Sequence, residues 1–382
     1  MKKYLIIPLI ILIFLTSLIS ARVVFADELS DNINEQLNNL DLSELENFID
    51  QLNNNQSSFL ESLKLMLNGE YDNGQANIYS YVLSIIFNSI NDFTPILLSV
   101  VAISLFCVFI QNSKSSFASE GVSEIIYLIG FLTILLLMSS PIYSIYNNTK
   151  NNIENIAKLN EIMSPIIITL MIASGGSVSA SVYKPVVTTF SNIVINLMLY
   201  VVMPILGLCV ILCILSNFSK HFNFNKFTDV FFSVVKWALG ISVTIYSLFM
   251  SIQGVSSAMH DGISIKATKY AISNSIPIIG GFLKDGFDLF LAGSVLIKNA
   301  IGVVSLFSLL SFMISPILNV AVFCLILKII SAITQVISDN KISSFCTSLS
   351  KAITYINVVQ ILISVMFFIT ILLMIFSANA FI

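Results

Sequence analysis

The chain has 382 residues, of which 56% are hydrophobic and only 10% are charged. A water-soluble globular protein carries about 25% charged residues, so a soluble core of this length cannot absorb so much apolar sequence. Lipid must surround most of the chain, and the sequence therefore predicts an all-α, polytopic helical membrane protein.

Charge divides the chain into an acidic N-terminal part and a mildly basic remainder. Residues 27–80 hold eleven acidic side chains and one basic side chain, Lys64, whereas residues 81–382 hold ten acidic and fourteen basic ones. Acidic surfaces repel nucleic acid and the later lysines are dispersed, so we expect no nucleic-acid partner.

The N-terminus has the pattern of a secretion signal. Two lysines precede a nearly continuous apolar run, 4–18, and Val24-Phe25-Ala26 ends in residues suited to cleavage. We predict a signal peptide, 1–26, that is cleaved after Ala26, with an uncleaved anchor as the alternative. In both cases the segment that follows is exported.

Residues 27–77 form this exported, acidic segment, which carries two narrow apolar stripes at helical spacing. Two stretches fit the capping box of a helix start, one from Asp41 to Glu44 and one from Ser58 to Glu61. Stripes this narrow cannot form a core in so few residues. We expect a small helical head that leans on the membrane surface, on a partner or on itself.

The remainder contains six apolar stretches, of which three run to about 30 residues, more than the roughly 20 that a spanning helix needs. They are 78–110, 125–142, 186–215, 230–252, 301–333 and 353–376.

A Pro-Ile-Leu sequence recurs in the three long stretches. Its prolines, Pro95, Pro204 and Pro316, are 109 and 112 residues apart. We predict tandem repeats of about 110 residues, each with an amphipathic segment, a proline-bearing span, a lysine-bearing loop and a second span. Chance alignment of isoleucine-rich helices is the alternative. The corresponding units are 78–161, 162–260 and 261–382.

The exported head sets the orientation of the spans. The first span then runs inward, and the same parity places five lysines of later loops and span ends inside, as the positive-inside rule prefers: Lys114, Lys220, Lys226, Lys341 and Lys351. Residues 253–300 would lie outside with four lysines, which weakens the argument.

Catalytic and metal-binding motifs are missing from the sequence. There is no P-loop, HExxH, GxSxG or dinucleotide fingerprint, and the two histidines, His221 and His260, are far apart. Cys209 and Cys213 share a helix face but lack further ligands, so we interpret them as small buried apolar side chains. We expect no enzymatic activity, no cofactor and no metal.

Two lysines stand inside apolar stretches. Lys236, beside Trp237, lies eight residues after Thr228, and Lys328 is similarly placed. An intramembrane lysine is a candidate functional residue, but one near a span end can extend to the interface. We favour the second interpretation.

The most informative polar stretch is 261–302. Pro277 and nearby glycines break its helical pattern, and broken backbone at membrane depth requires protein or a water-filled cavity to cover it. The stretch is either a re-entrant or groove-lining segment of a pore or subunit contact, or an amphipathic helix pair in the interface. Lys284 and Asp288 are four residues apart and can pair.

The signal peptide, the acidic head, Tyr183-Lys184-Pro185, the block from Asp261-Gly262 to Gly280-Gly281 and residues 292–302 together resemble the stage III sporulation protein AE family of endospore-forming Firmicutes. With the polar stretch, these motifs supply the candidate assembly or pore residues: Lys184, Pro185, Asp261, Lys266, Lys269, Pro277, Gly280, Gly281, Lys298 and Asn299.

The resemblance implies a non-enzymatic membrane subunit of a secretion-like channel complex, or feeding tube, between mother cell and forespore, required for forespore development after engulfment. The implied partners are other proteins of the stage III sporulation A operon, namely a cytosolic ATPase and ring-forming intermembrane proteins, and stage II sporulation protein Q. The implied location is the mother-cell (outer forespore) membrane, with the N-terminal segment in the intermembrane space.

A stand-alone permease for a small solute is the alternative function. It would require carboxylates or paired charges near the bilayer midplane. Glu154 and Asp229 lie at span edges or in loops, which does not favour it.

Overall fold

The computed structural model describes residues 33, 35–37, 40–52, 59–67, 75–112, 120–218, 224–275, 279–337 and 340–377. Every regular element in these ranges is a helix, which confirms the predicted all-α class. The predicted signal peptide lies outside the described residues.

Two short helices precede a bundle of long ones. The short helices are α3 (Ser43–Leu52) and α4 (Phe59–Leu67), and the bundle contains α5 (Gln75–Asn112), α6 (Glu120–Ala173), α10 (Asn225–Ser275), α11 (Ile279–Val336) and α12 (Asn340–Phe376). One further rod is built from consecutive α- and π-helical pieces: α7 (Ser177–Pro185), η1 (Val186–Phe190), α8 (Ser191–Leu197), η2 (Met198–Val202) and α9 (Met203–Phe218).

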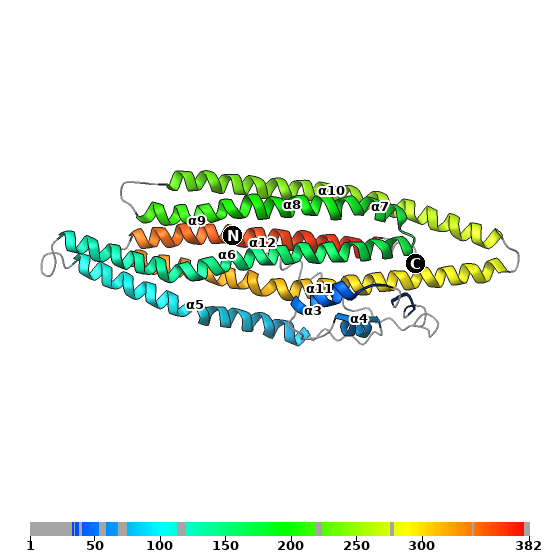
Figure 1. Ribbon diagram of the computed structural model, residues 1–382, viewed down its shortest axis with the longest axis horizontal. Helices are drawn as coiled ribbons and strands as arrows, with labels where there is room; N and C mark the ends of the chain where they lie inside the picture. Colours follow the sequence, from blue (N-terminus) through cyan, green and yellow to red (C-terminus); the bar gives the residue numbers. More distant parts are fainter. Residues whose placement is uncertain are drawn as a thin grey trace.

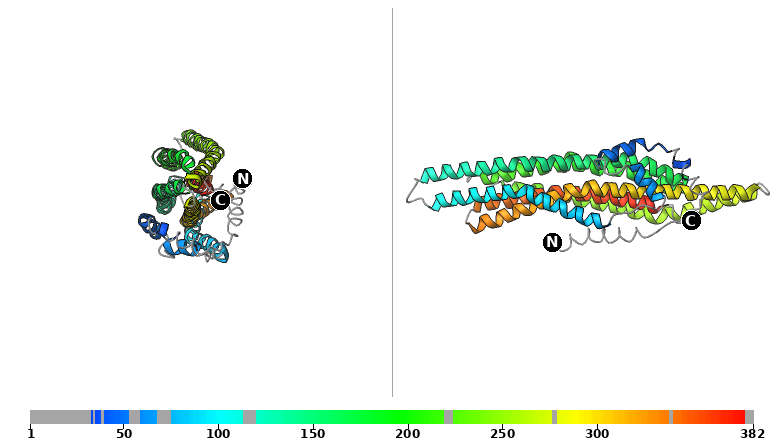
Figure 2. Two further views of the ribbon diagram at one scale, coloured as in Figure 1. Left: turned by 90° about the vertical axis from the view of Figure 1, so that its right-hand side faces the viewer. Right: turned by 90° about the horizontal axis from the view of Figure 1, so that it is seen from below.

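The long helices run side by side in an elongated bundle (Figure 1). Its loop end holds the end of α5 and the starts of α6, α10 and α12. Its junction end holds the end of α6, the start of α7 and the end of α12. Seen end-on, α10 and α5 lie at opposite edges (Figure 2), so α12 and α11 occupy the interior.

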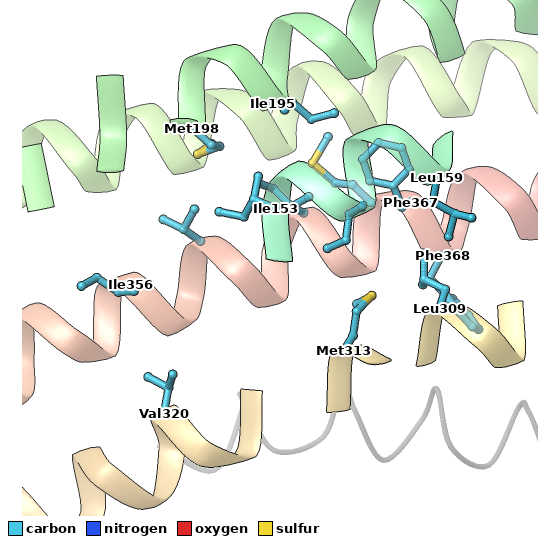
Figure 3. Close-up of a cluster of buried hydrophobic side chains, with 14 of the residues drawn as sticks. Ile153, Leu159, Ile195, Met198, Leu309, Met313, Val320, Ile356, Phe367 and Phe368 are labelled. Atoms are coloured by element: carbon cyan, nitrogen blue, oxygen red, sulfur yellow. The ribbon is translucent and has the colours of Figure 1, made fainter. Parts of the chain in front are cut away.

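The hydrophobic core surrounds α12, which packs against α6, α9, α10 and α11. Ile356, Phe367 and Phe368 of α12 are buried against side chains of α6, α8 and α11 (Figure 3). Because a helix that is apolar on all faces needs cover on all faces, α12 is central while the outer helices expose apolar side chains.

Six helical segments are long and apolar enough to cross a membrane, as the sequence predicts. However, α6 has 54 residues and α11 has 58. At 1.5 Å per residue these helices are about 80 to 90 Å long, against a hydrocarbon thickness of about 30 Å. The bundle therefore extends well beyond the bilayer. The apolar pattern predicted too short a helix for α6, because the polar residues 147–161 continue the helix without a break.

The acidic head lies on the long helices. Helix α3 contacts α6, and α4 contacts α11. Phe48 is buried beneath the Lys158 ammonium, which lies 5.0 Å from the ring centroid. Gln36 donates to the Phe290 carbonyl at 3.1 Å and accepts from the Ser294 hydroxyl at 2.9 Å. The support that the head needs thus comes from the body of the same chain.

Acidic side chains cap both head helices. Asp41 accepts hydrogen bonds from the hydroxyl and the backbone N–H of Ser43, and these bonds hold its pKa below the ordinary value. Asp50 of α3 accepts from the Phe59 N–H at 2.9 Å, so it satisfies a free donor at the start of α4. Ser58, the predicted cap, lies outside the described residues.

Close packing of α11 on α12 supplies a test of the core. A Cβ at Gly302 would clash with Cγ1 of buried Ile375 and lie 2.7 Å from its Cδ1, whereas a Cβ at Gly286, in the same helix, would meet nothing within 4 Å. We predict that Gly302→Ala lowers the free energy of unfolding by about 1–3 kcal/mol through overpacking. Gly286→Ala should raise it slightly through helix propensity. Thermal unfolding in lipid nanodiscs measures both, and equal effects would contradict the α11–α12 packing.

Candidate functional site: the junction of α6, α7, α10, α11 and α12

A tight turn reverses the chain between α6 and α7. Gly175 has φ 86°, a left-handed conformation that glycine adopts without steric cost. The N–H of Gly176 donates to the Met171 carbonyl at 2.8 Å, which closes the end of α6. A Cβ at Gly175 would lie 2.7 Å from the side chain of Ile265, so α10 passes directly over the turn.

Asp261 of α10 caps the start of α7. Its side chain is fully buried. Oδ1 accepts from the Val178 N–H at 2.9 Å, and Oδ2 accepts from the Ser179 N–H at 3.2 Å and from the Ser179 hydroxyl. The first N–H groups of a helix lack partners within it and carry partial positive charge, so a carboxylate suits them. A residue 82 positions away along the chain thereby fixes the start of α7.

Lys298 of α11 plays the opposite role at the end of α12. It is fully buried, and its Nζ donates to the Ser377 carbonyl. The last carbonyls of a helix lack partners and carry partial negative charge, which an ammonium group complements. The Ser377 hydroxyl also lies 3.6 Å from Sδ of Met171, so the same point joins α6.

A buried negative charge, Asp261, thus binds the partially positive start of α7, and a buried positive charge, Lys298, binds the partially negative end of α12. The capped residues belong to α7 and α12, the charges belong to α10 and α11, and α6 contributes the turn. Each charge is satisfied by backbone groups, which lowers the cost of burying it. The arrangement fixes the relative positions of five helices and offers no nucleophile–base pair.

Other candidate residues lie apart from this junction. Lys184 and Pro185 are exposed at the end of α7, and Lys266 is exposed on α10. Lys269 pairs with Asp288 at 2.7 Å, which joins α10 to α11 where they approach their connection.

The predicted pairing of Asp288 with Lys284 is therefore wrong. A partner four residues away on one helix gives only weak stabilisation, and the neighbouring helix brings Lys269 closer. Gly280 and Gly281 lie within the first turn of α11, while Pro277 lies outside the described residues. Asn299, next to Lys298, is half-buried.

Several residues of the junction went unrecognised in the sequence. Ser179 and the two glycines of the turn have a local signal, because Gly-Gly followed by Ser-x-Ser is typical of a helix end and a new start. Tyr246 of α10, whose hydroxyl donates to the Met366 carbonyl of α12 and contacts Thr370, has none.

Metal-binding geometry is not found in the described ranges, where no three His, Cys, Asp or Glu side chains are grouped closely enough to hold an ion. None of the five cysteines forms a disulfide, and all five are buried.

These features define an all-helical, multi-pass membrane protein whose spans continue into a long bundle outside the lipid. The family model for stage III sporulation protein AE matches residues 57–378, so the chain belongs to this family and acts in sporulation. A relative in Bacillus subtilis (strain 168), stage III sporulation protein AE, is 26% identical over 318 residues, covering 83% of this chain and 80% of the relative. No solved structure matches the chain.

Removal of the Asp261 carboxylate tests the junction. Asp261→Ala would leave the half-buried N–H of Val178 and the buried N–H and hydroxyl of Ser179 without this acceptor, so we predict a loss of about 2–4 kcal/mol in the free energy of unfolding. Lys266→Ala, on the exposed face of the same helix, should change it by less than about 0.5 kcal/mol. Chemical or thermal unfolding in nanodiscs measures both. Equal stability of the two variants would show that the cap contributes nothing.

Proposed function

We propose that this chain is a non-enzymatic membrane subunit of the channel complex that connects mother cell and forespore, and that forespore development after engulfment requires it. Membership of the stage III sporulation protein AE family over 57–378 is the observation that carries the proposal. The partners in the proposal are a cytosolic ATPase, ring-forming intermembrane proteins and stage II sporulation protein Q.

The dimensions of the bundle support a role between two membranes. Helices of about 80 to 90 Å exceed the hydrocarbon by more than about 40 Å in total. The α10–α11 hairpin projects past the other helices at the junction end (Figure 1). In the proposed orientation this end and the acidic head face the intermembrane space, and the loop end, with Lys226 and Lys341, faces the mother-cell cytoplasm.

The head is placed to meet other proteins. It is held against α6 and α11 by buried apolar side chains, such as Leu45 and Leu63. Its acidic side chains Glu44 and Glu61 are exposed. A docked helix pair with a charged outer face is a surface for polar, basic partners rather than for lipid.

The permease alternative finds little support in the core. Apart from Lys298 at the junction, buried polar side chains between α6, α11 and α12 are amides and hydroxyls: Thr149 donates to Gln360 at 3.2 Å, and Asn357 donates to the Ile317 carbonyl at 3.3 Å. Coupling-ion transport normally uses intramembrane carboxylates. Of the carboxylates within candidate spans, Asp92 and Asp229 lie on exposed faces and not in the core, and Asp229 is paired with Lys351.

Gene deletion tests the proposed function. We predict normal vegetative growth and engulfment, followed by arrest of forespore development and loss of heat-resistant spores. A copy with Ser264→Ala, an exposed position on the same helix, should restore spores, whereas Asp261→Ala should not, since the junction positions the helices beyond the membrane. Counts of heat-resistant spores and microscopy of engulfed cells are the measurements. A solute-uptake defect in vegetative cells, with normal spores, would instead favour the permease.

A further inference from the structure

Two charged side chains lie in the middle of candidate spans and face outward. Asp92 is the one charged residue within the span Ser80–Ile110, and Lys236 lies within the span Lys226–Leu248. Both are exposed. Among the described residues neither takes part in an ion pair, whereas nearby Asp229 is paired with Lys351 at 2.8 Å.

Both charges lie ten or more residues inside their candidate spans, which places Lys236 deeper than the sequence alone indicated. Asp92 lies 12 residues from Ser80 and 18 from Ile110, or about 18 and 27 Å along the helix. Lys236 lies 10 and 12 residues from the ends of its span, or about 15 and 18 Å. A charge that is exposed to hydrocarbon is costly, so a protein partner that covers either charge would lower this cost.

The two charges stand at the same height along the bundle. The ring of Phe93, the residue after the carboxylate, packs against Phe323 of α11 with centroids 4.8 Å apart. The cysteine after Phe323 accepts a hydrogen bond from Thr354 of α12 at 3.6 Å. Next to it, the ring of Tyr355 lies 6.0 Å from the ammonium of Lys236. One cross-section of the bundle thus contains both groups.

Their helices form opposite edges of that cross-section (Figures 1 and 2). Both helices also expose apolar side chains near the charge, although not on the same face of the helix. On α5 these include Phe87 and Leu98, which are 61% and 62% exposed, and on α10 they include Val230 and Trp237, which are 61% and 73% exposed. The two edges are therefore alike in apolar character and opposite in charge, which makes them complementary to each other.

We propose that the occupant of each edge is a second copy of this chain, so that α5 of one copy packs against α10 of the next and Asp92 pairs with Lys236. If neighbouring copies are related by rotation about an axis parallel to the bundle, every residue keeps its position along that axis. Two different residues can then meet across the contact only if they lie at the same position along the bundle. A head-to-tail contact of this kind repeats into a ring or a row. The inference goes beyond the proposed function and stands on geometry and charge alone.

Charge reversal in the purified full-length chain tests the contact. Self-association is measured by energy transfer between labelled copies in proteoliposomes over a range of protein-to-lipid ratios. Asp92→Lys or Lys236→Asp alone should weaken association at least about tenfold, because each places like charges together. The double variant should recover most of it. Lys328→Glu, an exposed change on α11 outside the contact, should have no effect.

Mixing the two single variants separates loss of contact from misfolding. The Asp92→Lys chain would then pair with the Lys236→Asp chain through the two introduced charges. In the other contact between these chains, the native Asp92 of the Lys236→Asp chain would meet the native Lys236 of the Asp92→Lys chain. Both contacts then hold opposite charges, so the mixture should associate like the unmodified chain. Recovery in the mixture and in the double variant supports the proposal. An unmodified chain that stays monomeric at every ratio, or single variants that associate normally or fail to recover on mixing, would overturn it. Neither result bears on the deletion phenotype.

Discussion

The bond between the Asp261 carboxylate and the first N–H groups of α7 determines how the rest of the chain is arranged. The reversal at Gly175 returns the chain toward the loop end, and the cap fixes where the returning rod starts. That rod and α10 then enclose α12, whose end is held by Lys298. Without this cap, a helix start would be buried with free donors, a costly state in a low-dielectric interior.

Much of the fold could be predicted from the sequence because apolar length is a strong signal in a membrane protein. Each of the six spans overlaps one apolar stretch read from composition, although the spans in α6 and α11 are much longer. Helix α10 ends at Ser275 and α11 begins at Ile279, on either side of Pro277. Helix lengths outside the lipid were harder to predict, since the polar run 147–161 of α6 has no breaker and the helix simply continues.

The candidate site was predicted in part, and its limits have a physical cause. Asp261 and Lys298 were candidates because they lie in the polar stretch 261–302, whose motifs resemble those of the family. Their partners are backbone N–H and carbonyl groups, which every residue carries, so the sequence could not identify them. The π-helical pieces that flank α8 also lack a sequence signal. Asn160 donates to the carbonyl of Val187 within one of them at 3.3 Å, a contact between distant segments.

The same chain thus combines a lipid-facing part, with exposed apolar helices, and an outer part held by hydrogen bonds and buried charges. This division supports the proposed role between two membranes, because hydrogen bonds and buried charges can hold the outer part without lipid. The acidic head is then a docked extension of the outer part, held by apolar contacts with α6 and α11.

Hydrogen exchange of the unmodified chain in lipid nanodiscs tests the cap most directly. The first amides of a helix normally exchange quickly because they lack an acceptor. The buried carboxylate predicts that the amides of Val178 and Ser179 exchange slowly, at rates comparable to those inside α12. Rapid exchange at these two positions, like that of an ordinary helix start, would contradict the account.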